Sequence, residues 1–299
     1  MPQLPITSGQ KQILWSPLPT LRVFPNRHTT RPSESKYTLR ADQVSQWLDF
    51  PRNVLERVKD LGEPPEGFTP RVPAESHVTG NENGLQGRYV QNVGNVLGPI
   101  FDGLGLNLLM ADYQVGLQVD SRSTDRSEAM EQRKRQPDLV LVGASDYVIC
   151  LVGELKTYWT FRPAKGQSDK DYLAQKLGQL ARYMDDHRCR FGFYSTYERT
   201  WFLMRSSSMG FRVSEPIPHN QVASTTKPSV RQCFLYLAAL INDRKAAFWP
   251  ETFGLPLTDQ PRDDPARVQP SRVGKGKRRK FTDTMQESFE PRRVGKFWG

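Results

Sequence analysis

Several features that mark common functional classes are missing from this 299-residue sequence. It holds three cysteines, far apart and without a Cys-x-x-Cys pair, and its four histidines are isolated. This composition argues against a structural zinc site and against a disulfide framework, and it favours a reducing environment. No Gly-x-Ser-x-Gly elbow and no phosphate-binding Gly-Lys-Ser/Thr loop occurs, so serine hydrolases and P-loop nucleotidases have no support either.

Long hydrophobic runs are missing too. The most apolar stretch, FLYLAALI from Phe234, is shorter than the eighteen or so residues that a membrane span requires, and it suits a buried helix. The N-terminus lacks the basic start and apolar centre of a secretory signal. We therefore expect an intracellular protein without a membrane partner.

Charge is what the sequence has in excess, and it is unevenly distributed. The chain carries 42 Lys+Arg against 32 Asp+Glu, a net of +10. From Gln260 onward there are 11 Lys+Arg and 5 Asp+Glu, a net of +6, which leaves 31 against 27, or +4, for the first 259 residues. An excess of positive charge predicts a polyanionic partner, nucleic acid first of all.

The run GKGKRRK at Gly274–Lys280 concentrates this charge. Its candidate nucleic-acid-binding residues are Lys275, Lys277, Arg278, Arg279 and Lys280. The run also has the composition of a nuclear import signal, although charge runs are often only solvated, disordered chain. We expect the nucleus, with the cytoplasm as the alternative.

Periodicity divides the chain into three parts. Residues 1–75 predict a largely irregular region with short helices at 41–50 and 52–61, residues 76–250 an α/β domain, and residues 251–299 a basic disordered tail. Within the domain the expected order is a helix, a strand, a hairpin, a helix, two strands and a helix, which predicts a mixed sheet. The expected ranges are 85–100 with Asn81 or Asn83 as N-cap, 106–114, a hairpin turning at 143–146, 171–187, 191–205 with a turn at 197–198, and 230–242.

The chemistry concentrates in QPDLVLVGASDYVICLVGELK, residues 136–156. Side chains alternate along a strand, so Glu154 and Lys156 project to the same side. If the hairpin folds back on itself, Asp138 comes near Glu154. Two adjacent carboxylates repel each other, and a divalent cation removes that cost. Their hard oxygen ligands suit Mg²⁺, with Mn²⁺ as a substitute, and Lys156 would orient a water or stabilise charge on a phosphate.

Pro137-Asp138 followed by Glu154-Leu155-Lys156 resembles the PD-(D/E)xK nuclease superfamily, over roughly residues 82–205. The resemblance implies a restriction-endonuclease-like core, a central mixed sheet flanked by helices with irregular N- and C-terminal extensions. It implies that Asp138 and Glu154 hold Mg²⁺, that Lys156 is catalytic, and that hydrolysis of a phosphodiester leaves a 5′-phosphate. DNA is favoured over RNA as the substrate.

Two weaker matches extend the resemblance. Gln179 and Tyr183 fit a Gln-x-x-x-Tyr motif that some branches of the superfamily carry, which adds Gln179 to the catalytic site. Glu82 fits the acid of the first helix and becomes a third metal ligand. With STYERTWFL after the helix, the arrangement looks most like nuclease-like domains of fungal proteins.

Other interpretations remain open at this point. Asp138 also suits a turn before a strand, and Glu154 with Lys156 an exposed ion pair. Gln179 lies opposite the leucine face of its helix, so either that helix has a second buried side, with Tyr172 and Tyr183, or the glutamine faces solvent. The alternative to a nuclease is a catalytically inactive, nuclease-like module that binds nucleic acid or a protein. In a purely structural protein the two acids would lie apart.

Overall fold

The computed structural model describes residues 6–25, 38–70, 72, 74–112, 115, 136–163, 165–207 and 210–249. The predicted basic tail at 251–299, with its run at 274–280, lies outside these residues, and so does the polar stretch at 119–135. The helices are α1 (Ser8–Trp15), α2 (Phe50–Val58), α3 (Glu82–Tyr89), α4 (Asn95–Gly103), α7 (Asp169–Asp186), α8 (Val230–Ile241) and α9 (Arg244–Ala247). Short turns of other helix types are η1 (Ala41–Gln43), η2 (Lys59–Leu61), η3 (Val90–Gly94) and η4 (Tyr158–Thr160).

A mixed sheet of eight strands forms the centre of the protein. Its strands are β2 (Val44–Gln46), β4 (Leu108–Ala111), β5 (Leu139–Gly143), β6 (Ile149–Leu155), β7 (Phe191–Ser195), β8 (Arg199–Arg205), β9 (Phe211–Val213) and β10 (Ile217–Pro218). The spatial order is β2-β9-β8-β7-β6-β5-β4, with β10 paired to β8. The pairs β6–β7 and β2–β9 are parallel and the other pairs are antiparallel. Outside this sheet, β1 (Arg22–Val23) pairs with β3 (Val78–Thr79).

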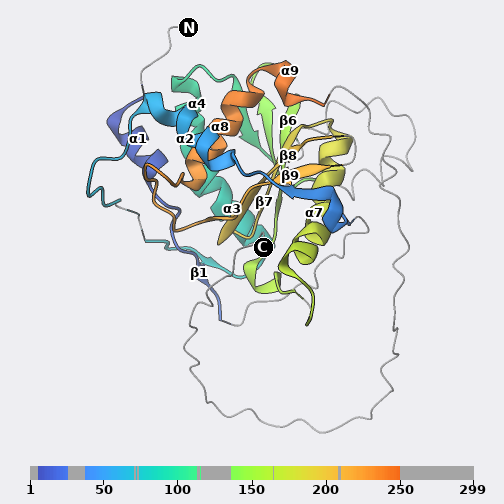
Figure 1. The fold of residues 1–299 in the computed structure, drawn as a ribbon. Coiled ribbons are helices and arrows are strands. Elements are labelled where there is room, and N and C mark those ends of the chain that lie inside the picture. Colours follow the sequence, from blue (N-terminus) through green and yellow to red (C-terminus); the bar gives the residue numbers. More distant parts are fainter. Residues whose placement is uncertain are drawn as a thin grey trace, which may run out of the picture.

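Helices cover both faces of the sheet (Figure 1). The long helix α7 lies on one face, where its leucines pack against β6, β7 and β8. Helices α1, α2, α3, α4 and α8 contribute to the apolar core on the other face. The sheet is therefore enclosed, and its central strands β5 and β6 are buried at every position. Burial on both faces explains why these two strands are apolar along almost their whole length.

Local signals in the sequence account for the elements around the site. Ser168 caps α7 by accepting a hydrogen bond from the backbone of Asp171, and Ser229 caps α8 in the same way. Gly153 in β6 has a packing reason, because a Cβ there would lie 2.0 Å from the ring of Phe193 on β7. Glycine at position 153 therefore leaves room for the ring of Phe193 where β6 pairs with β7.

Most expected elements are confirmed. The hairpin, the helix before β7, the two strands at 191–205, the helix at 230–242 and the α/β class with a mixed sheet all occur. The helix expected at 41–50 is wrong. A 3₁₀ turn and strand β2 replace it, because Val44 pairs with Phe211 at the sheet edge, a contact that local periodicity does not reveal. The helix expected at 85–100 is interrupted by the π-helical turn η3, and Asn81 is its N-cap.

The described part of the N-terminal region packs into the same core. Leu14 at the end of α1 is buried, and Arg231 of α8 donates hydrogen bonds to the carbonyls of Ile13, Ser16 and Pro17. Residues before 76 thus supply helices and a strand to the central domain. Within the described residues, no helix combines the length and apolarity needed to cross a membrane.

Candidate functional site

The antiparallel register of β5 and β6 brings Asp138 beside Glu154. Leu139 pairs with Gly153, and the N–H of Asp138 donates to the carbonyl of Gly153 at 3.0 Å. Oδ2 of Asp138 in turn accepts a hydrogen bond of 2.7 Å from the backbone of Leu155. The hairpin therefore brings Asp138 and Glu154 side by side in the register of the two strands, as the sequence predicted.

Glu154 and Lys156 form a buried ion pair. Oε1 of Glu154 lies 2.5 Å from Nζ of Lys156, and their side chains are only 1% and 15% exposed. An exposed pair on a strand end is therefore excluded. Apart from this ion pair, neither carboxylate oxygen of Glu154 accepts a hydrogen bond of good geometry from the described part of the chain. A buried carboxylate in this condition is costly, since burial removes its water without replacing it.

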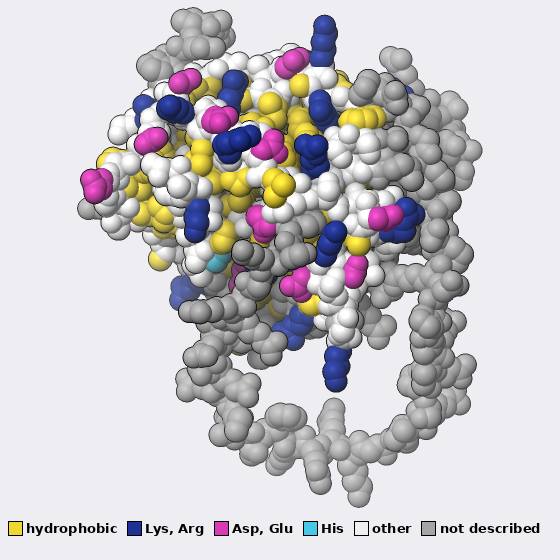
Figure 2. Space-filling view, viewed as in Figure 1, with side chains coloured by type: hydrophobic (Ala, Val, Ile, Leu, Met, Phe, Trp, Pro, Cys, Tyr) yellow, Lys and Arg dark blue, Asp and Glu magenta, His cyan; other side chains and the backbone are white. Residues whose placement is uncertain are grey.

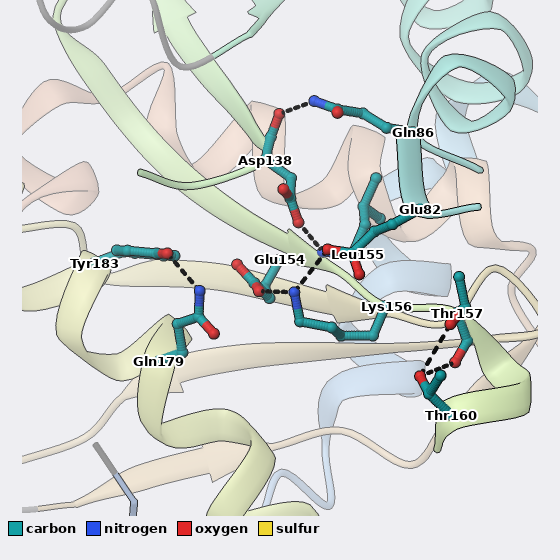
Figure 3. A network of polar contacts seen from close by, with 10 residues as sticks. All are labelled: Glu82, Gln86, Asp138, Glu154, Leu155, Lys156, Thr157, Thr160, Gln179 and Tyr183. Atoms are coloured by element: carbon teal, nitrogen blue, oxygen red, sulfur yellow. Dashed lines mark hydrogen bonds and ion pairs between the residues drawn. The ribbon is translucent and has the colours of Figure 1, made fainter. Parts of the chain in front are cut away.

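Glu82 reaches the same ammonium from a different element. It opens α3, where the side chain of Asn81 accepts from the backbone of Gly84 and fixes the start of the helix. Its Oε1 accepts a hydrogen bond of 2.8 Å from Nζ of Lys156. Lys156 consequently lies between two glutamates, one from the strand and one from the helix (Figure 3).

Gln86 is a member of the site that the sequence analysis missed. It follows Glu82 by one helical turn, and its Nε2 donates to the backbone carbonyl of Asp138 at 2.6 Å. This contact fixes the backbone that carries Asp138. The i, i+4 spacing of Glu82 and Gln86 places both on one helix face, and that spacing is a signal that was present in the sequence.

The Gln-x-x-x-Tyr match lies at the side of the site, on α7. Nε2 of Gln179 donates to the hydroxyl of Tyr183 at 2.6 Å, and Figure 3 shows the polar ends of both residues facing the Glu154 side of the cluster. Tyr172 and Tyr183 are buried, Gln179 is half-buried and Gln175 is exposed. The helix therefore has the second buried side that was one of the two interpretations.

Tyr194 is a second residue that the sequence analysis missed. It pairs with Glu154 in the register of β6 and β7, so both side chains lie on the same face of the sheet. Its hydroxyl is buried and makes no hydrogen bond to the described residues. Within the described residues, a tyrosine hydroxyl without a hydrogen-bond partner thus lies on the same sheet face as a carboxylate whose only partner is Lys156.

The pKa values show how strongly the groups of the site act on each other. Burial, and then the neighbouring charge of Asp138, raises the pKa of Glu154 to about 8. Burial also raises the pKa of Asp138 to about 6, although Lys156 and the backbone of Leu155 oppose this. Burial by itself would lower the pKa of Lys156, but the carboxylates of Glu154, Asp138 and Glu82 outweigh it and raise that pKa. The ammonium therefore stays charged while the two buried acids retain protons easily.

The donor chemistry of the site fits a hard divalent cation. Glu82, Asp138 and Glu154 offer carboxylate oxygens, which Mg²⁺ and Mn²⁺ prefer, and among the described residues Glu154 has only Lys156 as a partner for its oxygens. Across the described ranges, however, no three His, Cys, Asp or Glu side chains are grouped closely enough to hold a metal ion. The ammonium of Lys156 lies between two of these acids, so coordination by all three requires Lys156 to move.

No protein-family model, curated protein or solved structure matches the chain. A functional interpretation therefore depends on the residues of the site and on their geometry.

Proposed function

We propose that this chain is a Mg²⁺-dependent nuclease that hydrolyses phosphodiester bonds of nucleic acid. The observation that carries the proposal is Glu154, a carboxylate buried at the end of a central strand beside Asp138 and Lys156, whose oxygens accept no hydrogen bond of good geometry from the described residues apart from the ion pair with Lys156. Such an arrangement costs stability, and proteins retain it mainly where chemistry requires it. The PD-(D/E)xK resemblance assigns the same three residues to a nuclease site.

In this proposal Asp138 and Glu154 hold Mg²⁺, or Mn²⁺ in its place, with Glu82 as the third ligand. A cation held there would supply Lewis acidity toward a phosphodiester and toward a bound water molecule. The backbone N–H of Leu155 and the amide of Gln86 keep Asp138 oriented. Lys156 orients the attacking water or offsets charge on the phosphate. Gln179, bonded to Tyr183, borders the site from α7.

We propose DNA as the substrate, in preference to RNA. On the face shown in Figure 2, basic and acidic side chains are interspersed, and the basic ones do not gather into one patch. Phosphate contacts on this face would then be few. The basic residues Lys275, Lys277, Arg278, Arg279 and Lys280, outside the described residues, would supply further contacts and would direct the protein to the nucleus.

A second candidate function is a nuclease-like module that binds nucleic acid or a protein without cleaving it. The observation in its favour is that Lys156 already pairs with two of the acids, and no metal-sized group of acids is present in the described part of the chain. In this case the cluster would serve only as a buried ion-pair network.

Cleavage of plasmid and single-stranded DNA tests the two candidates against each other. Wild type, Asp138→Ala and Lys156→Ala are compared with Mg²⁺, with Mn²⁺ and with EDTA. Lys165→Ala, which changes an exposed lysine outside the site, is the matched control. Cleavage that EDTA and both site variants abolish, but the control retains, supports the nuclease. Cleavage that survives in both site variants contradicts it, and salt-dependent DNA binding without cleavage supports the module.

A further inference from the structure

Lys156 has an unusual set of neighbours for a single lysine. Its Nζ contacts Glu154 at 2.5 Å and Glu82 at 2.8 Å, and the charge of Asp138 also acts on it. Within the cluster, three carboxylates therefore share one ammonium, and Figure 3 shows it directed into their midst. An ammonium in this position supplies the positive charge that the cluster needs.

A divalent cation would use the same oxygens. A metal ion bound through Oε1 of Glu154 would use the carboxylate face that Lys156 now contacts, and like charges at this distance repel strongly in a buried site. The two cations cannot occupy that face of Glu154 together. The ammonium and the metal are therefore competitors for one carboxylate.

The geometry also shows how Lys156 can give way. Its backbone is fixed, because its N–H donates to the carbonyl of Ser195 on β7 at 2.9 Å. The flexible part is the side chain, and its two acid partners differ in exposure. Glu154 is 1% exposed and Glu82 is 34% exposed. Rotation of the lysine side chain past the more exposed Glu82 and into solvent frees Glu154 while the strand stays in place.

We infer that Lys156 is the built-in counter-ion of this acid cluster, and that a divalent cation binds by displacing its ammonium from Glu154. The inference rests on the proposed function, since it concerns the same site and the same class of cation. It adds that Lys156 itself lowers the affinity of the site for a divalent cation. In the absence of the cation, the ammonium of Lys156 offsets the negative charge of the acids.

The affinity for Mn²⁺ alone tests the inference without any reaction. Free Mn²⁺ is measured by electron paramagnetic resonance at pH 8 in titrations of the full chain. Lys156→Met keeps the length of the side chain but removes its charge, and we expect its Mn²⁺ affinity to rise at least about tenfold over wild type. Lys165→Met, the matched change of an exposed lysine, should leave the affinity unchanged. Equal or weaker affinity of Lys156→Met, or no Mn²⁺ binding by either protein, overturns the inference.

A measurement on wild type covers the case in which Lys156→Met does not fold. Acetic anhydride labels exposed amines, and mass spectrometry of chymotryptic peptides reports each lysine separately. Mg²⁺ should increase labelling of Lys156 several-fold relative to Lys165, because the displaced ammonium becomes accessible. Labelling of Lys156 that Mg²⁺ leaves unchanged or lowers overturns the inference.

Plasmid cleavage by wild type in the same buffers separates this inference from the proposed function. Cleavage by wild type, with no gain of affinity in Lys156→Met, removes the counter-ion role and leaves the nuclease standing. Absence of both cleavage and Mn²⁺ binding contradicts both. Tighter Mn²⁺ binding by Lys156→Met without cleavage by wild type keeps the counter-ion role and contradicts the nuclease.

Discussion

Two buried glutamates of this protein have opposite surroundings. Glu75, before α3, accepts hydrogen bonds from Nε of Arg88 at 2.8 Å, the backbone of His77 at 3.1 Å and Asn92 at 3.4 Å. Glu154, at the end of β6, has the ion pair with Lys156 and no hydrogen bond of good geometry within the described residues. The same side chain is thus fully satisfied in one place and left unsatisfied in the other.

The difference appears in the two pKa values. Burial would raise the pKa of Glu75, but its hydrogen bonds and Arg88 outweigh burial and lower it. At Glu154 burial prevails and raises the pKa to about 8. Burial alone therefore does not identify a functional acid in this fold. A functional candidate is an acid that is buried and whose oxygens remain available.

The largest expected effect is on cleavage. If the chain is a nuclease, Glu154→Gln should lower the rate of plasmid cleavage on the order of 10³-fold, because a neutral amide is a poor ligand for Mg²⁺. Glu75→Gln should change the cleavage rate of the folded protein little, because the oxygens of Glu75 already accept hydrogen bonds from neighbouring residues. Initial rates at saturating Mg²⁺ measure both, with folding checked by circular dichroism. Similar losses of cleavage rate in the two variants would show that Glu154 has no special role in cleavage.

The second effect is on the free energy of unfolding. Here Glu75→Gln should cause the larger loss and Glu154→Gln the smaller one. Glu75→Gln leaves the Arg88 guanidinium, only 12% exposed, without its acid, and should lower the free energy of unfolding by about 3 kcal/mol. Glu154→Gln removes a charge that is poorly solvated and should cost less than about 1 kcal/mol. Urea denaturation of both variants measures the difference. A larger loss in Glu154→Gln would show that its ion pair is structural.

The pH dependence of stability should also separate the two acids. The folded pKa of Glu154 lies above its ordinary value, so the folded state keeps a proton that the unfolded chain releases. Its contribution to stability therefore falls as the pH rises from about 4.5 to 8, and Asp138, with a pKa raised to about 6, acts in the same direction. For Glu75 the pKa is lowered, so its contribution is lost as the pH falls below its ordinary value.

Urea denaturation between pH 4 and 8 tests these signs. Wild type should lose stability between pH 5 and 8, and Glu154→Gln should lose less over this interval. Glu75→Gln should instead flatten the decline of stability on the acid side. A Glu154→Gln profile parallel to that of wild type from pH 5 to 8 would contradict the raised pKa.

The smallest effect concerns the two tyrosines that accompany these acids. Tyr197 is buried, accepts a hydrogen bond from Asn92 at 2.8 Å and donates one to the carbonyl of Pro19 at 2.8 Å. Tyr197→Phe should therefore cost about 1–2 kcal/mol. The hydroxyl of Tyr194 has no hydrogen-bond partner in the described residues, so Tyr194→Phe should be neutral or slightly stabilising. Thermal unfolding of both variants gives the comparison, and a loss in Tyr194→Phe as large as that in Tyr197→Phe would show a hidden partner.

Part of this site could be predicted from the sequence, and the reason is local. The strand alternation and the turn between β5 and β6 fix where Asp138, Glu154 and Lys156 lie relative to one another, and all three are within twenty residues. Gln86 and Tyr194 come from other elements, and their role depends on how α3 and β7 dock against β6. That docking is a tertiary property, and periodicity carries no information about it.

The elements of the fold also differ in whether the local sequence or a distant partner specifies them. Helices α7 and α8 show a clear apolar period and a serine cap, and the sequence predicted both. Strand β2 has three residues and owes its conformation to pairing with β9, which lies about 170 residues later in the chain. Likewise, the burial of Arg231 follows from backbone carbonyls near α1, at the other end of the chain. Such elements are specified by partners that are distant in sequence.

The docking of α1 and β2 onto late elements has a consequence for biosynthesis. The residues up to Trp47 leave the ribosome before β9 and α8, yet Val44 pairs with β9, Ser16 contacts Arg231 of α8, and Leu14 contacts the N-cap of α8. At about 5–20 residues per second, synthesis of the roughly 180 residues between Trp47 and Arg231 takes on the order of 10 to 40 seconds. During that time the nascent N-terminal segment has its apolar side chains without their final cover. Chaperones would therefore be able to bind this segment before β9 and α8 have been synthesised to cover it.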